Sequence, residues 1–421
     1  MSHSSMRVVR ASIRLFFIIV CSIAFFLSGF AIRNRRKVLF GAWLGKKCAD
    51  NPKYLLLYLS KQELNLDIVW IGENEVKSKI PSSVGVRFVT KGSIAACWEM
   101  LTAGACFVSH GMIDLGRLNL MRGACRVYLG HGLAIKNMGS KQKKSNFRVL
   151  ETLRRLHMQT RRCDYYIASS NAHREKLLIE TAICNAATEK IINCGQPRID
   201  FLCEKSHSGQ AELCKDHFLK AYELSSSMRV ITYLPTFRDS RKSSFSFTSL
   251  DDEQRTQLNG ILADLDAIIV EKCHFSEVWK PNEKQNLPSQ VYSITNANDV
   301  DTQELLLVTD LLITDYSGCY IDFLALKRPI IHFAYDRKYY ENEDRGLYFN
   351  LDEIAGGPIV QSFEMLCCMI EKGLQKATSH RDYQERARKK LIEYEQGSAC
   401  RQIVDTVFKR THSQTAWRSF T

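Results

Sequence analysis

A single histidine lies between two glycines in the stretch VYLGHGLAIKNMG, residues 127–139. The imidazole of His131 titrates near neutral pH, so it could accept a proton from a substrate hydroxyl as a general base. Gly130 and Gly132 would let a bulky substrate reach the ring, and they permit backbone dihedrals that other residues avoid. A histidine that only completes a turn is the alternative, and position alone favours that alternative.

The stretch LLITDYSGCYIDFLALKRPII, residues 311–331, has the pattern of a strand, a polar turn, a helix and a second strand. We expect the first strand to end at Thr314 and the helix to begin near Cys319. Unpaired N–H groups at a helix start attract phosphate. Thr314 and Ser317 add hydroxyls, and Gly318 permits a close approach. Ordinary capping of the helix is the alternative. Neither GxxxxGK[ST] nor GxGxxG occurs, so the common nucleotide-binding motifs are absent from the sequence.

Short apolar runs typical of buried strands alternate with helical stretches, which indicates an α/β fold with parallel sheets. The runs are KVLFGAW, LDIVWIG, VRFVT, ACFVSH, CRVYLGH, DYYIASS, KIINCG, RVITYLP, AIIVEKC, LLITD and PIIHFA. The polar stretch of residues 203–228 carries no strand pattern. We therefore expect one domain over residues 38–205 and a second over residues 227–385, with a linker over residues 206–226 and a C-terminal helix and tail over residues 386–421.

The formal net charge of the chain is +13. Such a surplus favours an anionic partner: a membrane surface, a nucleic acid or a phosphorylated substrate. The charge is diffuse and no nucleic-acid-binding motif occurs, so we expect no nucleic acid partner. The 15 cysteines include no CxxC pair, which argues against a zinc site or a disulfide framework and indicates a reducing compartment. We predict no cofactor, and no DxD ends a strand run. A divalent ion that helps the pyrophosphate to leave is an alternative that the sequence leaves open.

Two segments could contact a membrane. The run Leu15–Ile32 has no charge, and its length is close to the minimum for a membrane-spanning helix. We expect a membrane anchor over residues 1–37, with a signal peptide or a buried or interfacial helix as alternatives. The basic cluster after the run favours a body on the cytoplasmic side of the cell membrane. The basic segment 141–162 would form an amphipathic helix on anionic lipid headgroups, or a solvated surface helix.

Seven stretches resemble, in the same order, the sequence boxes of the CDP-glycerol glycerophosphotransferase family, the teichoic-acid primases and polymerases. They extend from about residue 38 to about residue 370. The stretches are FGAWLGKKCADNPKYLLLYL, GHGLAIKNMG, NCGQPRIDFL, YLPTFRD, EKCHF, LITDYSGCYIDFLALKRPI and RGLYFNLDEIAGGPIV. The seven stretches occur in the same order as the family's boxes, and this shared order is more specific to the family than any single stretch.

The resemblance implies a GT-B-like (glycosyltransferase-B-like) architecture, in which two Rossmann-type domains face a cleft and hold the acceptor and the CDP-linked donor respectively. It implies transfer of a polyol phosphate, first of all glycerol phosphate, from a CDP-polyol to a hydroxyl of a lipid-linked glycan acceptor, with release of CMP. The product would be a teichoic-acid-like wall or capsule polymer. His131 matches the family's general base, and His274 matches a second histidine that would stabilise charge on the pyrophosphate. Arg198 and Asp200 would form a structural turn near the domain junction.

The resemblance also implies roles in substrate binding for Lys136, Thr236, Arg238, Thr314, Ser317, Gly318 and Asp322. Lys136 would steady the acceptor. Thr236 and Arg238 would hold the donor phosphates, the arginine as a bidentate fork. The turn 314–318 would surround the same phosphates, and Asp322 would touch the polyol or order the loop.

Four positions depart from the family pattern. Gly130 replaces a tryptophan, Leu133 a threonine, Phe275 a proline and Gly318 a serine. These departures leave the acceptor and the polyol open, so CDP-ribitol is an alternative donor. A GT-B glycosyltransferase that uses a nucleotide sugar is a second hypothesis, because a fold does not fix chemistry. An inactive scaffold that binds anionic glycolipids is a third.

Overall fold

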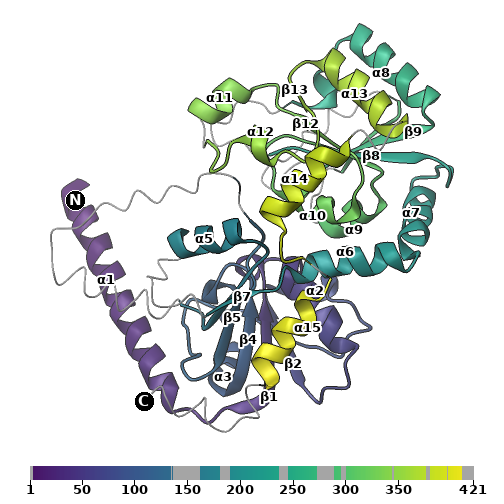
Figure 1. The fold of residues 1–421 in the computed structure, drawn as a ribbon. Coiled ribbons are helices and arrows are strands. Elements are labelled where there is room, and N and C mark those ends of the chain that lie inside the picture. The colour runs from purple at the N-terminus through teal and green to yellow at the C-terminus, as the bar shows by residue number, and fades with distance from the viewer. Residues whose placement is uncertain are drawn as a thin grey trace.

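The computed structural model contains two parallel β-sheets, each flanked by helices (Figure 1). It describes residues 3–133, 135, 162–180, 190–236, 245–272, 289–294, 300–343, 346–375, 380–395 and 397–409. Three predicted site residues, Lys136, Arg238 and His274, and residues 141–161 of the predicted basic helix lie outside these ranges. The predicted α/β class with parallel sheets is confirmed.

The first sheet has seven strands in the order β3-β2-β1-β4-β5-β6-β7, and every adjacent pair is parallel. The strands are β1 (Asn34–Gly41), β2 (Asp67–Gly72), β3 (Arg87–Thr90), β4 (Ala103–Val108), β5 (Cys125–Tyr128), β6 (Tyr165–Ala168) and β7 (Ile191–Asn193). The helices of this domain are α2 (Asp50–Ser60), α3 (Ile94–Thr102) and α5 (Asn171–Glu180). Successive residues of β1 point into opposite cores. Val38 and Phe40 pack into the core on one face of the sheet, and Leu39 packs into the core on the other face. Burial on both faces explains why the strands read as continuous apolar runs.

The second sheet has six strands in the order β10-β9-β8-β11-β12-β13, again parallel throughout. The strands are β8 (Arg229–Leu234), β9 (Ala267–Lys272), β10 (Val291–Ile294), β11 (Leu311–Thr314), β12 (Ile330–Phe333) and β13 (Ile359–Val360). The helices are α8 (Asp252–Asp264), α9 (Thr302–Val308), α10 (Cys319–Phe323), α11 (Arg337–Asn342), α12 (Leu351–Ile354), α13 (Phe363–Gln375) and α14 (Arg381–Leu391). The predicted strand end at Thr314 and helix start at Cys319 are both observed.

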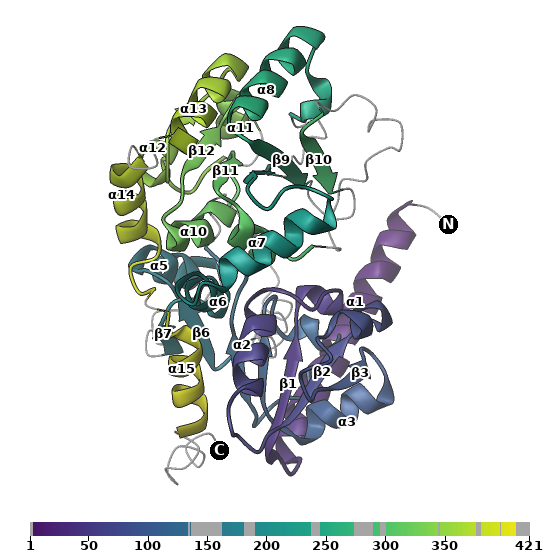
Figure 2. The ribbon, with the colours of Figure 1, turned by 90° about the vertical axis from the view of Figure 1, so that its right-hand side faces the viewer.

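The chain passes between the two domains twice (Figure 2). The first passage leads from β7 into α6 (Pro197–His207) and α7 (Gln210–Ala221), so most of the segment expected to be a linker is helical. The second leads from α14 to α15 (Ala399–Val404), which returns to the first sheet and packs Ile403 into the same core as Phe40. The exact domain boundaries stay a prediction.

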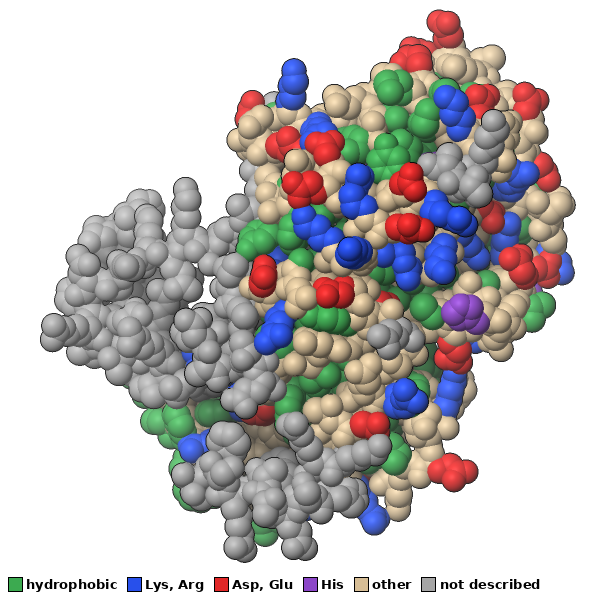
Figure 3. Space-filling view, viewed as in Figure 1, with side chains coloured by type: hydrophobic (Ala, Val, Ile, Leu, Met, Phe, Trp, Pro, Cys, Tyr) green, Lys and Arg blue, Asp and Glu red, His purple; other side chains and the backbone are tan. Residues whose placement is uncertain are grey.

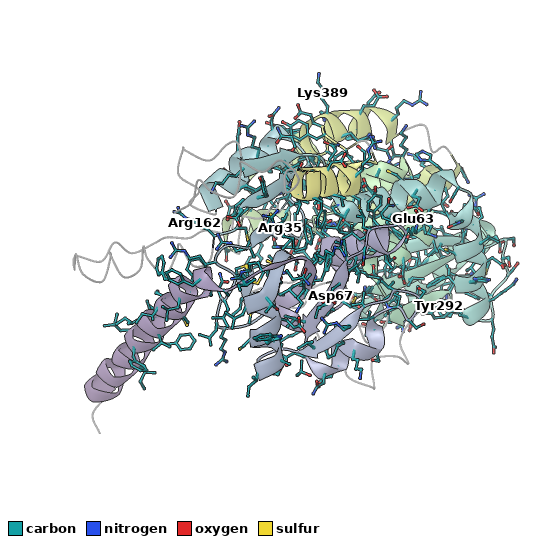
Figure 4. All side chains as sticks on the ribbon, turned by 90° about the horizontal axis from the view of Figure 1, so that it is seen from below. Arg35, Glu63, Asp67, Arg162, Tyr292 and Lys389 are labelled. Atoms are coloured by element: carbon teal, nitrogen blue, oxygen red, sulfur yellow. The ribbon has the colours of Figure 1, made fainter. Side chains whose placement is uncertain are left out.

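Helix α1 (His3–Leu27) extends away from both sheets (Figure 4). No helix among the described residues is long and apolar enough to cross a membrane, so the predicted spanning anchor is not found. The uncharged run predicted from the sequence is helical only as far as Leu27. A short turn, Ser28–Phe30, follows, in which Ser28 is buried, and the guanidinium of Arg33 donates hydrogen bonds to the carbonyls of Ser28 (2.9 Å) and Arg122 (2.7 Å).

Candidate active site

The predicted site residues that the structure describes lie at the carboxyl ends of strands in both sheets. His131 follows β5 in the first sheet, whereas Thr236 follows β8 and Thr314 ends β11 in the second. Ligands of open parallel sheets bind at this edge. The two edges meet, because a Cβ atom added to Gly318 would lie 3.2 Å from the carbonyl oxygen of Leu133. The histidine loop of one domain therefore contacts the predicted phosphate turn of the other.

The glycines that flank His131 are required by the backbone. Gly130 has a φ of 62° and Gly132 a φ of 102°, a region that favours glycine. A Cβ atom on Gly132 would also lie 2.2 Å from Nη2 of Arg198. The imidazole of His131 is partly exposed, and its Nδ1 is buried with no hydrogen-bond partner among the described residues.

A second histidine, which the sequence analysis did not single out, stacks on the first. The rings of His110 and His131 are 4.4 Å apart between centroids, with 9° between their planes, and the ring of Trp43 lies 4.8 Å from that of His110. Nδ1 of His110 lies 2.9 Å from the hydroxyl of Ser109. A sequence signal for it existed: SHG ends one strand run as GHG ends another, and β4 and β5 are neighbours in the sheet.

Both histidines of the stacked pair are uncharged at neutral pH. Burial lowers the pKa of His131 below its usual value of 6.5, and the nearby charge of His110 lowers it further. Burial likewise lowers the pKa of His110. The carboxylate of Asp50 acts in the opposite direction on both rings. An uncharged imidazole is the form that accepts a proton.

Buried Asp114 holds the loops around the stacked rings. Its carboxylate accepts hydrogen bonds from the backbone N–H groups of Leu44 (2.7 Å), Ser109 (2.8 Å) and His110 (2.8 Å). Trp43 and Leu44 have φ values of 49° and 58°, which costs about 1–2 kcal/mol for each residue that is not glycine. The hydrogen bonds from Leu44 to Asp114 and from the Trp43 N–H to the Ser109 hydroxyl (3.0 Å) offset that cost.

The predicted phosphate turn is tied to its own sheet. The hydroxyl of Thr314 is buried and donates a hydrogen bond to the carbonyl at the end of β8 (2.8 Å). The carboxylate of Asp315 accepts the backbone N–H of Thr236 at 2.9 Å. Ser317 and Gly318 are partly exposed. The turn therefore presents Ser317 and Gly318 at the surface, while the Thr314 hydroxyl is engaged inside the domain.

The side chain of His332 on β12 holds this turn in place. Its Nδ1 lies 3.0 Å from the carbonyl oxygen of Asp315, and its Nε2 accepts the backbone N–H of Gly356 at 3.1 Å. These partners assign the proton to Nδ1. Burial lowers the pKa of His332 to about 4, so the ring is neutral and acts as a structural link.

Arg198, on α6, joins the two sides of the site. Its Nη1 donates hydrogen bonds to Asp50 Oδ1 (2.7 Å) and to the carbonyl oxygen of His131 (2.8 Å), and its Nη2 donates to Asp322 Oδ1 (2.9 Å). Asp322 also accepts a hydrogen bond from Nε2 of Gln303 at 2.9 Å. The side chain of Asp322 is only 2% exposed, so it orders the protein around it. Its predicted contact with the polyol stays a prediction.

Lys272 at the end of β9 is a further buried cation near the junction of the domains. Its Nζ donates hydrogen bonds to the carbonyl oxygen of Val300 (2.6 Å) and the hydroxyl of Thr302 (3.0 Å), and burial lowers its pKa to about 8. Next to it, Lys53 on α2 forms an ion pair with Asp301 at 2.8 Å. These bonds connect helix α2 of the first domain to the start of α9 in the second.

The remaining site predictions cannot be placed. Lys136, Arg238 and His274 lie outside the described residues. Within the described part of the chain, no group of three or more His, Cys, Asp or Glu side chains is arranged to hold a metal ion.

Solved structures share this fold. The structure of the wall teichoic acid polymerase TagF matches with a TM-score of 0.75 and 23% identity, over 97% of this chain and 98% of that chain. A UDP-GlcNAc 2-epimerase from Neisseria meningitidis matches with a TM-score of 0.55 and 12% identity, over 89% and 100%. The arrangement expected from the GT-B-like resemblance, an α/β fold with two parallel sheets, is confirmed at the level of the fold.

Sequence comparisons agree with the predicted resemblance. The teichoic acid glycerol-phosphate transferase of Staphylococcus aureus is 27% identical over 387 residues, covering 89% of this chain and 94% of that protein. The teichoic acid poly(glycerol phosphate) polymerase of Bacillus spizizenii is 26% identical over 365 residues, covering 84% and 87%. A family model described as CDP-Glycerol:Poly(glycerophosphate) glycerophosphotransferase matches residues 23–409. Since that match spans both sheets and the site between them, the chain belongs to the CDP-glycerol:poly(glycerophosphate) glycerophosphotransferase family.

Proposed function

We propose that the protein transfers glycerol phosphate from CDP-glycerol to a hydroxyl of a lipid-linked glycan acceptor and releases CMP, with His131 as the general base. The observation that carries this proposal is the contact between the His131 loop and the turn 314–318. The loop of His131, whose imidazole has a pKa lowered by burial, meets a turn that presents Ser317 and Gly318 through the carbonyl oxygen of Leu133. Phosphoryl transfer to a hydroxyl needs this proximity of base and phosphate.

The reaction forms one P–O bond and breaks another. The acceptor hydroxyl oxygen attacks the phosphorus that carries the glycerol, and the bond from that phosphorus to the bridging oxygen of CMP breaks. The hydroxyl proton passes to His131, and CMP leaves with the electron pair of the broken bond. Negative charge gathers on the leaving phosphate, where the family resemblance assigns Arg238 and His274 as stabilising groups.

The surroundings of His131 suit a base that must gain and lose a proton in each cycle. Burial and the His110 charge disfavour the imidazolium, and the Asp50 carboxylate favours it. These opposing effects keep both protonation states accessible. Since the His110 ring is stacked at 4.4 Å, two positive charges would repel each other, so protonation of one ring disfavours protonation of the other.

A lipid-linked acceptor requires a membrane surface, and α1 presents apolar side chains that suit one. The exposed apolar residues of α1 and the turn after it are Ile13, Phe16, Phe17, Ile19, Val20, Ile23, Leu27, Phe30 and Ile32. An interfacial helix buries such side chains at the headgroup boundary. The net charge of +13 favours anionic lipids. Figure 3 shows Lys and Arg side chains gathered across the middle of one face, with Asp and Glu among them. We propose that the protein acts at the cytoplasmic face of the cell membrane.

The test is CMP release from radiolabelled CDP-glycerol by membranes that carry the wild type or His131→Ala, with CDP-ribitol and a panel of UDP-sugars in parallel. CMP release from CDP-glycerol that needs His131 and an added lipid acceptor supports the proposal. Turnover of UDP-sugars alone would show that the protein is an ordinary glycosyltransferase. Binding of CDP-glycerol with no turnover of any donor would support the inactive scaffold.

A further inference from the structure

The backbone of the His131 loop is held at three consecutive carbonyl groups. Nδ2 of Asn51 donates hydrogen bonds to the carbonyl oxygens of Leu129 (2.9 Å) and Gly130 (3.2 Å). Nη1 of Arg198 donates to the carbonyl oxygen of His131 at 2.8 Å. The loop thus has little freedom to rotate, although two of its residues are glycines.

The same arginine reaches the other domain. Nη2 of Arg198 lies 2.9 Å from Oδ1 of Asp322, which is in α10, immediately after the turn 314–318. The Arg198 side chain is 10% exposed, and those of Asp50 and Asp322 are 5% and 2% exposed. The backbone N–H of Arg198 also donates a hydrogen bond to Oδ1 of Asn51 at 3.2 Å. One buried side chain therefore contacts the base loop, the start of α2 and the helix that follows the phosphate turn.

Only a guanidinium fits this position. It presents several N–H donors in one plane, so two nitrogens can serve three oxygens that come from three segments. A lysine ammonium has three N–H donors on a single nitrogen, so it cannot occupy the positions of both Nη1 and Nη2. Gly132 completes the arrangement, because any side chain there would occupy the space of Nη2.

We propose that Arg198 is a positioning residue for the transfer reaction, which fixes the backbone of His131 to Asp322 and so sets the distance between the imidazole and the phosphates of the donor. This inference rests on the proposed function, since it assumes that His131 acts on a donor held at the turn 314–318. Asp322 is then the anchor of Arg198 in the donor domain, and its contact with substrate is not needed.

The proposal predicts that loosening the link lowers turnover without weakening the binding of the donor. A misplacement of a reacting group by about 1 Å costs on the order of 100-fold in rate. We therefore expect Arg198→Lys and Asp322→Asn each to lower kcat roughly 100-fold, while the Kd for CDP-glycerol changes less than about threefold, because in this proposal both side chains bond only to the protein. The double variant should be no worse than the worse single variant, since both break the same link.

The matched control is Arg126→Lys. Arg126 is similarly buried and is paired with Asp164 through two nitrogens at 3.0 Å each. That pair lies within the first domain, at the ends of β5 and β6 away from His131. Arg126→Lys should lower stability to a similar degree and leave kcat within about twofold.

A second measurement needs no donor. Amide hydrogen exchange at residues 129–133 should speed up in Arg198→Lys and in Asp322→Asn, and remain as in the wild type in Arg126→Lys. Asp322→Asn differs little in volume from the wild type, so it keeps the test valid if Arg198→Lys does not fold.

The outcomes separate the two proposals. A lower kcat with an unchanged donor Kd and faster exchange supports the positioning role. A weakened donor Kd in Asp322→Asn would overturn it in favour of direct substrate contact. Unchanged exchange in both variants, or additive losses in the double variant, would also overturn it. If the wild type releases no CMP from any CDP-polyol while exchange still responds, the proposed function fails and the link between the domains stands.

Discussion

Residues around the histidine pair adopt positive φ, among them Trp43, Leu44, Gly111, Gly130 and Gly132, whereas no residue of the turn 314–318 does. The histidine side also contains a ring nitrogen without a partner among the described residues. On the phosphate side, the hydroxyl of Thr314 and the carboxylate of Asp315 are bonded inside their own domain.

This difference indicates how the work is divided. The turn 314–318 has a relaxed backbone, so under the proposed function it suits a group that must only be bound. The backbone around the histidine pair is strained and holds two rings in a defined place, which is common where chemistry occurs. Changes on the histidine side should therefore affect turnover, and changes on the phosphate side should affect stability or donor binding.

The largest effect should come from His131→Ala. Removing the general base should lower kcat by about 10²–10⁴-fold, with the donor Kd unchanged. In the wild type, the acid limb of the rate profile should lie below pH 6.5, because burial lowers the pKa of His131 and keeps the base form at lower pH. His217→Ala on the exposed face of α7 is the control. A wild-type acid limb above pH 6.5 would contradict the assignment.

Gly132→Ala should be the next most severe change. The added methyl would strain a φ of 102° and displace the guanidinium of Arg198, so we expect a fall in kcat on the order of 100-fold. Gly209→Ala is the matched control, since its φ is 71° and no atom lies within 4 Å of the added Cβ. It should lower stability by about 1 kcal/mol and leave kcat intact. Equal kcat losses in the two variants would show that backbone strain, and not the displacement of Arg198, causes the loss.

His332 should make the stability of the donor domain depend on pH. Its pKa is lowered from 6.5 to about 4 in the folded protein, so the unfolded chain binds the proton first as the pH falls. The stabilisation is complete above pH 6.5 and is lost between pH 6.5 and 4, by roughly 3 kcal/mol. Urea unfolding at pH 7.5 and 5 should show a steeper loss for the wild type than for His332→Asn. An equal loss of unfolding free energy in the two proteins would show that other titrating groups dominate the pH dependence.

The smallest effect should come from Thr314→Val. Its hydroxyl is bonded to the end of β8, so its removal should lower the free energy of unfolding by about 1 kcal/mol and change the donor Kd little. Ser317→Ala, at the partly exposed position of the same turn, should weaken donor binding more. If Thr314→Val weakened the donor strongly at unchanged stability, the resemblance would be the better guide to this residue than its hydrogen bond.

The strands and the turn 314–318 were predictable because their signals are local. A strand buried on both faces reads as an apolar run wherever it occurs, and β11 follows this rule from Leu311 to Thr314. The family resemblance was likewise carried by short stretches. Helix α7 was missed because its segment is polar, and polar surface helices resemble linkers in composition.

The link through Arg198 was not predictable in the same way. Asp50, Arg198 and Asp322 come from three stretches far apart in the sequence. Each stretch resembles a family box, but nothing in the sequence shows that the three side chains contact each other. The left-handed Trp43 and Leu44 contradict local preference, and only their bonds to Asp114 and Ser109 hold them there. Such features depend on tertiary contacts, which local patterns do not encode.

The double passage of the chain between the domains limits how the site can open. Gln196, on the first passage, donates its backbone N–H to Oε2 of Glu395 on the second, at 2.9 Å. The backbone N–H of Tyr394 is in turn bonded to the carbonyl oxygen of Ser169 at 2.8 Å. The two connections are therefore bonded to each other and to the first domain, so a displacement of one domain against the other would have to break these bonds as well as the Arg198 link.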